Sequence, residues 1–182
     1  MNNADAVIVA VGAHNMMLPI PGSDNENVVS SWDILNKSKV VNGRVVVIGG
    51  GLVGAETSEY LANQGAQVSI VEMTDKIARE ESSTVLPTMM KDFADHGVKQ
   101  YINTRVSAIE NNGTLVKAFD TKEEKEITIE CDYIVMAAGS KKNILDVEGV
   151  TVPICYAGDC SGERTAGIKE AIRSGYKAAN EI

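Results

Sequence analysis

The sequence predicts an α/β fold in which a parallel sheet carries helices and an antiparallel meander. Unbroken β-branched runs such as Val45–Ile48 are typical of strands that are buried on both faces of a parallel sheet. A glycine-rich turn follows that run and opens a helical pattern. Further along the chain, short strands separated by turn residues predict antiparallel pairing.

The first predicted strand is Val7–Val11, which ends at Gly12. A linker follows, in which Pro19, Pro21 and Gly22 break regular structure. We therefore expect a domain boundary near Gly22. The next stretch, SSWDILNK, predicts one or two helical turns.

A βαβ unit comes next. Its predicted parts are a strand at Val45–Ile48, a helix at Leu52–Asn63 that stops at Gly65, and a strand at Gln67–Glu72. This order is Rossmann-like. A second helix is predicted at Ser82–His96, and it leads to the short strand VKQYI.

Three short strands then predict the meander, at Val106–Ile109, Leu115–Phe119 and Glu126–Ile129. The charged run DTKEEKE between the last two suits a solvated turn. The segment Asp132–Ala138 repeats the pattern of Asp5–Gly12, as DYIVMAAG against DAVIVAVG. Two similar strand ends, one on each side of the glycine loop, indicate two nucleotide-binding sheets interleaved in one chain.

The C-terminal segment predicts one more strand and a final helix. The strand VPICYAGDC ends in Gly158 and Asp159, and the helix covers Thr165–Ile182. The apolar positions of that helix fall on one stripe: Ile168, Ala171, Ile172, Gly175 and Ala178 or Ala179.

Composition excludes several classes of function. The 182 residues are 44% hydrophobic, enough for a core, and their net charge of -8 disfavours nucleic acid and anionic membranes as partners. The apolar runs are too short and glycine-rich to span a bilayer, and no signal peptide is visible, so we expect a cytoplasmic protein. With only three cysteines and two histidines, no metal site is expected.

The pattern Gly49-x-Gly51-x-x-Gly54 predicts a dinucleotide-binding loop, because it follows a strand and opens a helix. Gly49 permits the tight turn, Gly51 lets the backbone approach a pyrophosphate, and Gly54 allows close helix–strand packing. The helix N-terminus, including Leu52 and Val53, presents free N–H groups to the phosphates. The loop alone leaves open whether the dinucleotide is NAD or FAD.

Glu72 ends the second strand of the βαβ unit, where a carboxylate can accept hydrogen bonds from the ribose hydroxyls. The same carboxylate would repel a 2′-phosphate. The next residue is Met73 instead of an arginine, and the nearest cation is Lys76. The sequence therefore favours NAD over NADP.

These motifs resemble the pyridine nucleotide-disulphide oxidoreductase superfamily, flavoproteins in which an NAD domain is inserted into an FAD domain. The resemblance covers essentially the whole chain through AVGAHNMMLPIPG, IGGGLVGAE, AAGSKKN and CYAGDC, although Val11, Ser140 and Lys142 depart from the usual motifs. It implies that Gly12 ends an FAD-domain strand and that Glu56 lies near the nicotinamide. It also places Gly139 at the exit of the NAD domain and implies that Gly158 and Asp159 hold the FAD ribityl chain.

The C-terminal sequence EAIRSGYKAANEI looks most like the branch fused to an old-yellow-enzyme barrel, which includes 2,4-dienoyl-CoA reductases and enoate reductases. This resemblance implies an NAD(H)-binding domain at residues 23–146, flanked by partial FAD-domain segments at 1–22 and 147–182. FMN and a 4Fe–4S cluster are expected on domains outside this chain. The partners are then a nicotinamide dinucleotide and the rest of the same polypeptide, and the isolated chain is expected to bind without turnover.

Two alternatives remain open. The chain could be a free-standing NAD-binding module or sensor without catalysis. It could also be a small complete enzyme that uses Cys155 and Cys160, but Cys155 falls in a predicted strand and a buried cysteine commonly serves as a small hydrophobe. We assign no catalytic residue. The final substrate and any homo-oligomer are not readable from the sequence.

Overall fold

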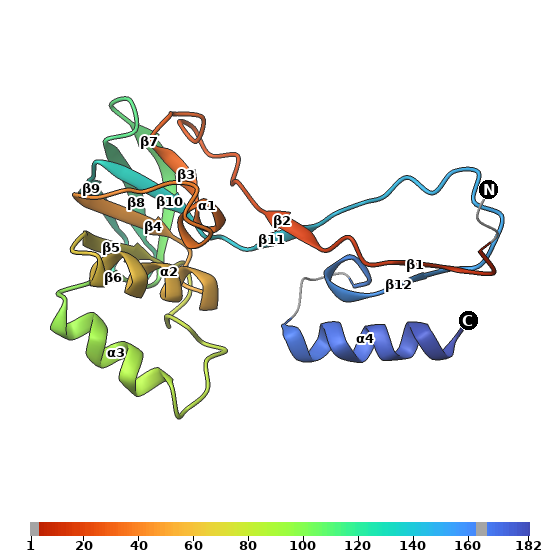
Figure 1. The fold of residues 1–182 in the computed structure, drawn as a ribbon. Coiled ribbons are helices and arrows are strands. Elements are labelled where there is room, and N and C mark those ends of the chain that lie inside the picture. Colours follow the sequence, from red (N-terminus) through yellow and green to blue (C-terminus); the bar gives the residue numbers. More distant parts are fainter. Residues whose placement is uncertain (1–3, 163–166) are drawn as a thin grey trace. The chain divides into compact units, whose positions relative to one another are not determined.

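A computed structural model of the protein describes residues 4–162 and 167–182, which belong to two compact units (Figure 1). One unit combines Met1–His14 with Ser140–Ile182, and the other is Asn15–Gly139. In sequence, the Asn15–Gly139 unit is therefore inserted into the other unit. Both divisions fall earlier in the chain than the expected boundaries after Gly22 and Asp146.

A five-stranded parallel sheet forms the centre of the Asn15–Gly139 unit. Its strand order is β3-β10-β4-β5-β6, and every neighbouring pair is parallel. The βαβ unit expected from the sequence supplies the middle of this sheet. The strands are β3 (Val28–Ser30), β10 (Tyr133–Met136), β4 (Arg44–Ile48), β5 (Gln67–Val71) and β6 (Lys99–Tyr101).

Helices cover one face of this sheet. They are α1 (Ser31–Leu35), α2 (Leu52–Asn63) and α3 (Leu86–Asp95). The core on this side joins helix residues such as Leu61 and Phe93 to sheet residues, and Phe93 is fully buried. Burial of these apolar side chains fixes α2 against β4 and β5.

The antiparallel meander covers the other face. Its strands are β7 (Thr104–Glu110), β8 (Leu115–Asp120) and β9 (Lys125–Glu130), paired in that order. Val116 and Ile129 of the meander share a buried core with β10. The predicted fold class, a Rossmann-like parallel sheet with an antiparallel meander, is confirmed.

The other unit contains shorter elements. Strand β1 pairs in parallel with β12, and α4 contacts both β12 and the 3₁₀ turn η1. Strands β2 and β11 form another two-stranded sheet. The predicted helix start at Thr165 lies outside the described residues. The bounds are β1 (Val7–Val9), β2 (Ala13–Asn15), β11 (Ser140–Lys142), β12 (Ile154–Tyr156), η1 (Gly158–Cys160) and α4 (Ile168–Asn180).

The apolar stripe expected on α4 is only partly buried. Ala178 is 3% exposed, whereas Ile168 and Ile172 are 81% and 68% exposed. The helix packs on its own unit through small side chains such as Ala171 and Ser174, which are half-buried. A helical stripe predicts which side chains share a face, but burial depends on what that face meets.

A carboxylate pair lies between α2 and α3 and makes stability pH-dependent. Burial raises the pKa of Glu59, and the hydrogen-bonded Asp92 carboxylate and Glu56 raise it further. The folded state therefore favours the protonated form of Glu59, and the ionised side chain destabilises the fold. This destabilisation is absent below the unfolded pKa of 4.5, grows as the pH rises above that value, and is fully present above the higher folded pKa.

We therefore expect Glu59→Gln to raise the free energy of unfolding at pH 7 by about 0.5 kcal/mol, the scale of relieving a like-charge helix pair. Urea denaturation at several pH values measures this gain, which should disappear below pH 4.5. A gain that is constant across this range would show that charge repulsion is not its source.

Candidate functional site

The glycine loop lies at the carboxyl end of β4, between β5 and β10. Gly49 has a φ of +107°, a conformation that favours glycine. Its N–H donates to the Val71 carbonyl at 2.9 Å, which ties the turn to the end of β5. A Cβ atom at Gly49 would lie 2.4 Å from the carbonyl oxygen of Ala137. Both conformation and space therefore require glycine here.

The other two glycines of the motif differ from each other in what surrounds them. A Cβ at Gly54 would lie 1.9 Å from the Gly49 carbonyl oxygen, so α2 lies against the end of its preceding strand. A Cβ at Gly51 would have no described atom within 4 Å. The φ of Gly51 is -66°, which any residue adopts. The structure of the unit itself therefore does not require glycine at Gly51, and open space lies beside it.

The N-terminus of α2 points its first N–H groups toward this open side. The helix begins at Leu52, and the first turn closes when the Ala55 N–H donates to the Gly51 carbonyl at 2.9 Å. The earlier N–H groups have no carbonyl one turn before them, which gives the terminus a partial positive charge. Val53 and Glu56 are exposed on the first turns. This arrangement suits a phosphate group.

Glu72 is held beside the loop. One carboxylate oxygen accepts the Gly50 N–H at 2.6 Å, and the other accepts the Thr74 N–H at 2.7 Å. Each oxygen of a carboxylate can accept more than one hydrogen bond, so the group retains capacity for hydroxyl donors. The neighbouring Met73 is 67% exposed, and the Lys76 side chain is also exposed.

A second contact with the loop was missed by sequence reasoning. The Ala78 N–H donates to the Gly50 carbonyl at 2.7 Å, and Ala78 has a φ of +47°. Ile77, 3% exposed, packs so closely that a Cβ at Gly50 would lie 2.6 Å from its Cδ1 atom. The sequence carries one signal for this close contact: position 50, which lies between the motif glycines Gly49 and Gly51, is also a glycine.

Gly139 follows the end of β10, the strand on the other side of β4. The Ala137 N–H donates to the Ile48 carbonyl at 2.8 Å, so the ladder between the two strands continues to the start of the loop. Gly139 has a φ of +106°, and its carbonyl accepts the Met16 N–H at 2.9 Å. The structure thus brings the predicted residues of this unit to the carboxyl end of its parallel sheet, where ligands bind in such folds.

The remaining predicted residues belong to the other unit. Gly12 and Gly158, with φ of +68° and +70°, follow the carboxyl ends of the parallel strands β1 and β12. Asn143 fixes the first turn by donating from its side chain to the Val11 carbonyl at 2.8 Å. The Gly158 N–H donates to the Ser174 hydroxyl at 2.8 Å, and Asp159 lies in the same 3₁₀ turn.

The cysteines are placed as packing residues. All three are free: Cys131 and Cys160 are buried, and Cys155 is half-buried. The Cys160 thiol lies 3.2 Å from the Val9 carbonyl and 3.1 Å from the Ala157 carbonyl. Burial raises the pKa of Cys131 to about 11, which disfavours its reactive thiolate. Within residues 4–162 and 167–182, no group of acidic, histidine and cysteine side chains could hold a metal ion.

A comparison with known protein families identifies the family of this chain. The family described as pyridine nucleotide-disulphide oxidoreductase matches residues 2–158. The chain belongs to this family. Its members are oxidoreductases, and the matched residues include the glycine loop, Glu72 and the Gly158 turn. In the part of the chain that the structure describes, no helix has the length and hydrophobicity required to cross a bilayer.

Several oxidoreductases are similar to this chain. A bilirubin reductase of Mediterraneibacter gnavus is 45% identical over 99% of this chain and 28% of the relative. An NADH oxidase of Thermoanaerobacter brockii is 34% identical over 98% of this chain and 28% of the relative. The solved structure of a 2-naphthoyl-CoA reductase complex superposes with a TM-score of 0.85 at 27% identity, covering 98% of this chain and 27% of that one. The chain therefore spans between a quarter and a third of the length of these relatives.

Proposed function

We propose that the Asn15–Gly139 unit binds NADH and that the chain is the NADH-binding part of a multidomain flavin-dependent oxidoreductase. One observation carries this proposal: a Cβ at Gly51 would meet no described atom within 4 Å, and Gly51 lies in the chain between Gly50, whose N–H donates to the Glu72 carboxylate, and Leu52, where α2 begins. A pyrophosphate needs the positive helix terminus, and an adenosine ribose needs a hydroxyl acceptor. The unit supplies both beside one free space.

In this proposal the loop residues have separate roles. The N–H groups at Leu52, Val53 and Gly54 face the pyrophosphate, and Glu72 accepts from the ribose hydroxyls. Glu56, exposed on the next turn of α2, extends toward the nicotinamide. Gly139 leaves room at the neighbouring strand end. These residues bind and orient the cofactor, and none of them is assigned a catalytic step.

The coenzyme is NADH instead of NADPH. Glu72 would repel a 2′-phosphate, and its carboxylate is already held in place by two backbone N–H groups. The similarity to an NADH oxidase also favours this choice.

The flanking segments belong to an FAD domain in this proposal. The domain assignment is residues 1–22 and 147–182 for the FAD-domain segments and 23–146 for the NAD(H) domain. Gly12, Gly158 and Asp159 would face the flavin at the carboxyl ends of β1 and β12. In the intact protein, bound FAD would accept the hydride from NADH, and an old-yellow-enzyme barrel with FMN and a 4Fe–4S cluster would reduce an unsaturated substrate.

The same proposal assigns the protein to the cytoplasm and makes the rest of its own polypeptide its main partner. A free-standing NAD-binding module or sensor is the second candidate, and it is favoured only by the compactness of the Asn15–Gly139 unit. The family match extends through residue 158, beyond that unit, and this supports the oxidoreductase instead.

Calorimetric titration of the chain with NADH, NADPH and FAD tests the proposal. NADH should bind more tightly than NADPH, and NADH alone should not be oxidised over hours in air because the isolated chain should not turn over. Failure to bind NADH, or an unchanged affinity when NADPH replaces it, would contradict the assignment. Tight FAD binding would show that the unit formed by residues 1–14 and 140–182 makes more of a flavin site than this proposal gives it.

Replacing Glu72 by alanine should weaken NADH binding by about 1–3 kcal/mol, because ribose hydroxyls then lose a charged acceptor. Calorimetry measures the change in NADH affinity. Thermal unfolding shows whether the chain stays folded, since the Gly50 and Thr74 N–H groups also lose their acceptor in this variant. Glu72→Gln is the matched control: it keeps one oxygen acceptor and removes the charge. This variant should reduce the difference in affinity between NADH and NADPH. An unchanged difference would show that Glu72 does not select the coenzyme.

A further inference from the structure

Two asparagine–glycine pairs lie in the Asn15–Gly139 unit, and neither belongs to the proposed dinucleotide site. One pair is Asn42 with Gly43, just before β4, and the other is Asn112 with Gly113, in the turn between β7 and β8. The side chain of an asparagine reacts most readily with the next backbone nitrogen when that residue is glycine, because no Cβ atom hinders the approach. Since the two pairs share this chemistry, the structure around each pair decides which of them reacts.

The backbone nitrogen of Gly43 lies against the side chain with which it would react. Its N–H donates to the Oδ1 atom of Asn42 at 2.7 Å. The Cγ atom that bears this oxygen is therefore within about 4 Å of the nitrogen, since a C=O bond is about 1.2 Å long. Reacting atoms that are roughly 3–3.5 Å apart form a near-attack arrangement. Both residues are exposed, so rotation about the side-chain bonds of Asn42 can bring the two atoms into line.

The second pair is held away from this reaction by its surroundings. The Gly113 N–H donates to the Glu110 carbonyl at 3.0 Å, so its nitrogen is engaged in the turn. The Gly113 carbonyl accepts from the Asn27 side chain at 2.7 Å, and Gly113 is buried although Asn112 is exposed. A Cβ atom at Gly113 would lie 1.9 Å from the Oδ1 atom of Asn27, which shows how closely the backbone is packed there. Attack by this nitrogen therefore requires the turn to open first.

We propose that Asn42 is a site of spontaneous deamidation in the folded chain and that Asn112 is protected from it. The Gly43 nitrogen forms a bond with Cγ of Asn42, and its proton passes through water to the side-chain amide nitrogen. The Cγ–Nδ2 bond then breaks and releases ammonia, which leaves a five-membered imide. Water opens this ring at either carbonyl, giving aspartate or isoaspartate at position 42. The reaction consumes only water, and the inference does not depend on the NADH proposal.

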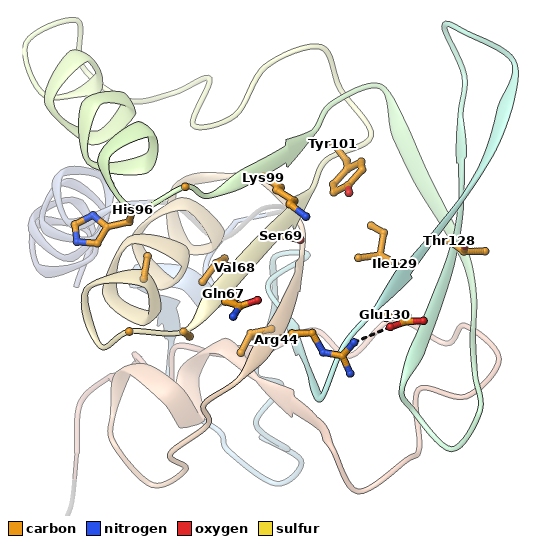
Figure 2. Close-up of a pocket in the computed structure, with 15 residues that line it drawn as sticks. Arg44, Gln67, Val68, Ser69, His96, Lys99, Tyr101, Thr128, Ile129 and Glu130 are labelled. Carbon is orange, nitrogen blue, oxygen red and sulfur yellow. Dashed lines mark hydrogen bonds and ion pairs between the residues drawn. The ribbon is translucent and has the colours of Figure 1, made fainter.

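Either product adds a negative charge at the start of β4. The Oδ1 atom of Asn42 accepts the Gly43 N–H at 2.7 Å, and Oδ2 of Asp132 accepts the next N–H along the chain at 2.8 Å. That next residue is Arg44, whose guanidinium is also bonded to Glu130 at the wall of the pocket in Figure 2. The modification therefore places a new carboxylate beside an arginine that already has two acidic partners.

Peptide mapping by mass spectrometry, after the chain has aged at mildly alkaline pH, tests this inference. Trypsin releases the two pairs in separate peptides, residues 40–44 and 106–117. In the folded chain, deamidation should be at least about tenfold faster at Asn42 than at Asn112, because Gly113 must first give up a hydrogen bond. The same incubation in urea is the matched control. Unfolding exposes both pairs equally, so the ratio of the two rates should fall to about one.

Two glutamine variants identify the residue that reacts, since glutamine keeps the amide but would have to close a larger ring. Anion exchange should separate a more acidic main product from the aged parent chain. Aged Asn42→Gln should lack this product, and aged Asn112→Gln should form it as the parent does. Loss of the product in Asn112→Gln, or equal rates at the two asparagines in the folded chain, would overturn the inference. A tenfold ratio that persists in urea would also overturn it, because the local sequence would then set the selectivity.

Discussion

Gly54→Ala is expected to lower the free energy of unfolding by about 3 kcal/mol, at the upper end of the usual cost of overpacking. In an exposed helix the same change would stabilise by about 1 kcal/mol, because alanine is the better helix former. Here the added Cβ would lie 1.9 Å from the Gly49 carbonyl oxygen and 3.3 Å from the Ala137 Cβ. The nearest of these is a backbone atom of the loop, so α2 must move away from the end of β4.

Urea denaturation monitored by circular dichroism measures this loss. Gly175→Ala is the matched control, since Gly175 lies inside α4 and a Cβ there would meet no described atom within 4 Å. That variant should leave stability unchanged or raise it. If Gly54→Ala proved as stable as the parent chain, α2 would not pack against the loop as closely as the structure shows.

Gly51→Val is expected to lower NADH affinity by about 100-fold, or about 3 kcal/mol, while the fold remains intact. The backbone conformation at Gly51 is open to all residues, and the side chain would enter space that contains no described atom. If the pyrophosphate occupies that space, the valine side chain blocks its approach to the backbone. Stability should change by no more than about 1 kcal/mol, the scale of an N-cap substitution.

Calorimetry gives the affinity of Gly51→Val, and thermal unfolding shows whether the chain is folded. The comparison with Gly54→Ala separates the two glycines: one variant should lose stability, and the other should lose binding. Normal NADH affinity in a folded Gly51→Val protein would mean that the dinucleotide does not pass beside this residue, and the proposed site would be wrong.

Local signals in the sequence predicted the elements near the glycine loop well. The helix expected at Leu52–Asn63 has those bounds in the structure, because the loop starts it and Gly65 follows its end. The helix expected at Ser82–His96 begins only at Leu86, with Pro87 in its first turn. Proline favours the first turn of a helix, and that preference set the start more strongly than the periodic pattern did.

Elements that depend on distant pairing were not predictable. Strand β3 was not expected, and its three residues form a strand because they pair with β10, far along the chain. In the same way, Glu72 could be placed at the strand end from its position, but the Ala78 contact could not. A left-handed alanine has no sequence signature, since its conformation is imposed by the surrounding contacts.

The hydrogen bonds around Gly50 have a consequence for the kinetics of recognition. Its N–H is held by Glu72 and its carbonyl by Ala78, while the neighbouring Gly49 N–H is held by Val71. The loop backbone is thus fixed by the protein before any ligand arrives, so little conformational freedom remains to be lost on association. Association with a dinucleotide should then be a single-step, rigid docking. Its observed rate should rise in proportion to ligand concentration, whereas a slow loop rearrangement would make that rate level off at high concentration.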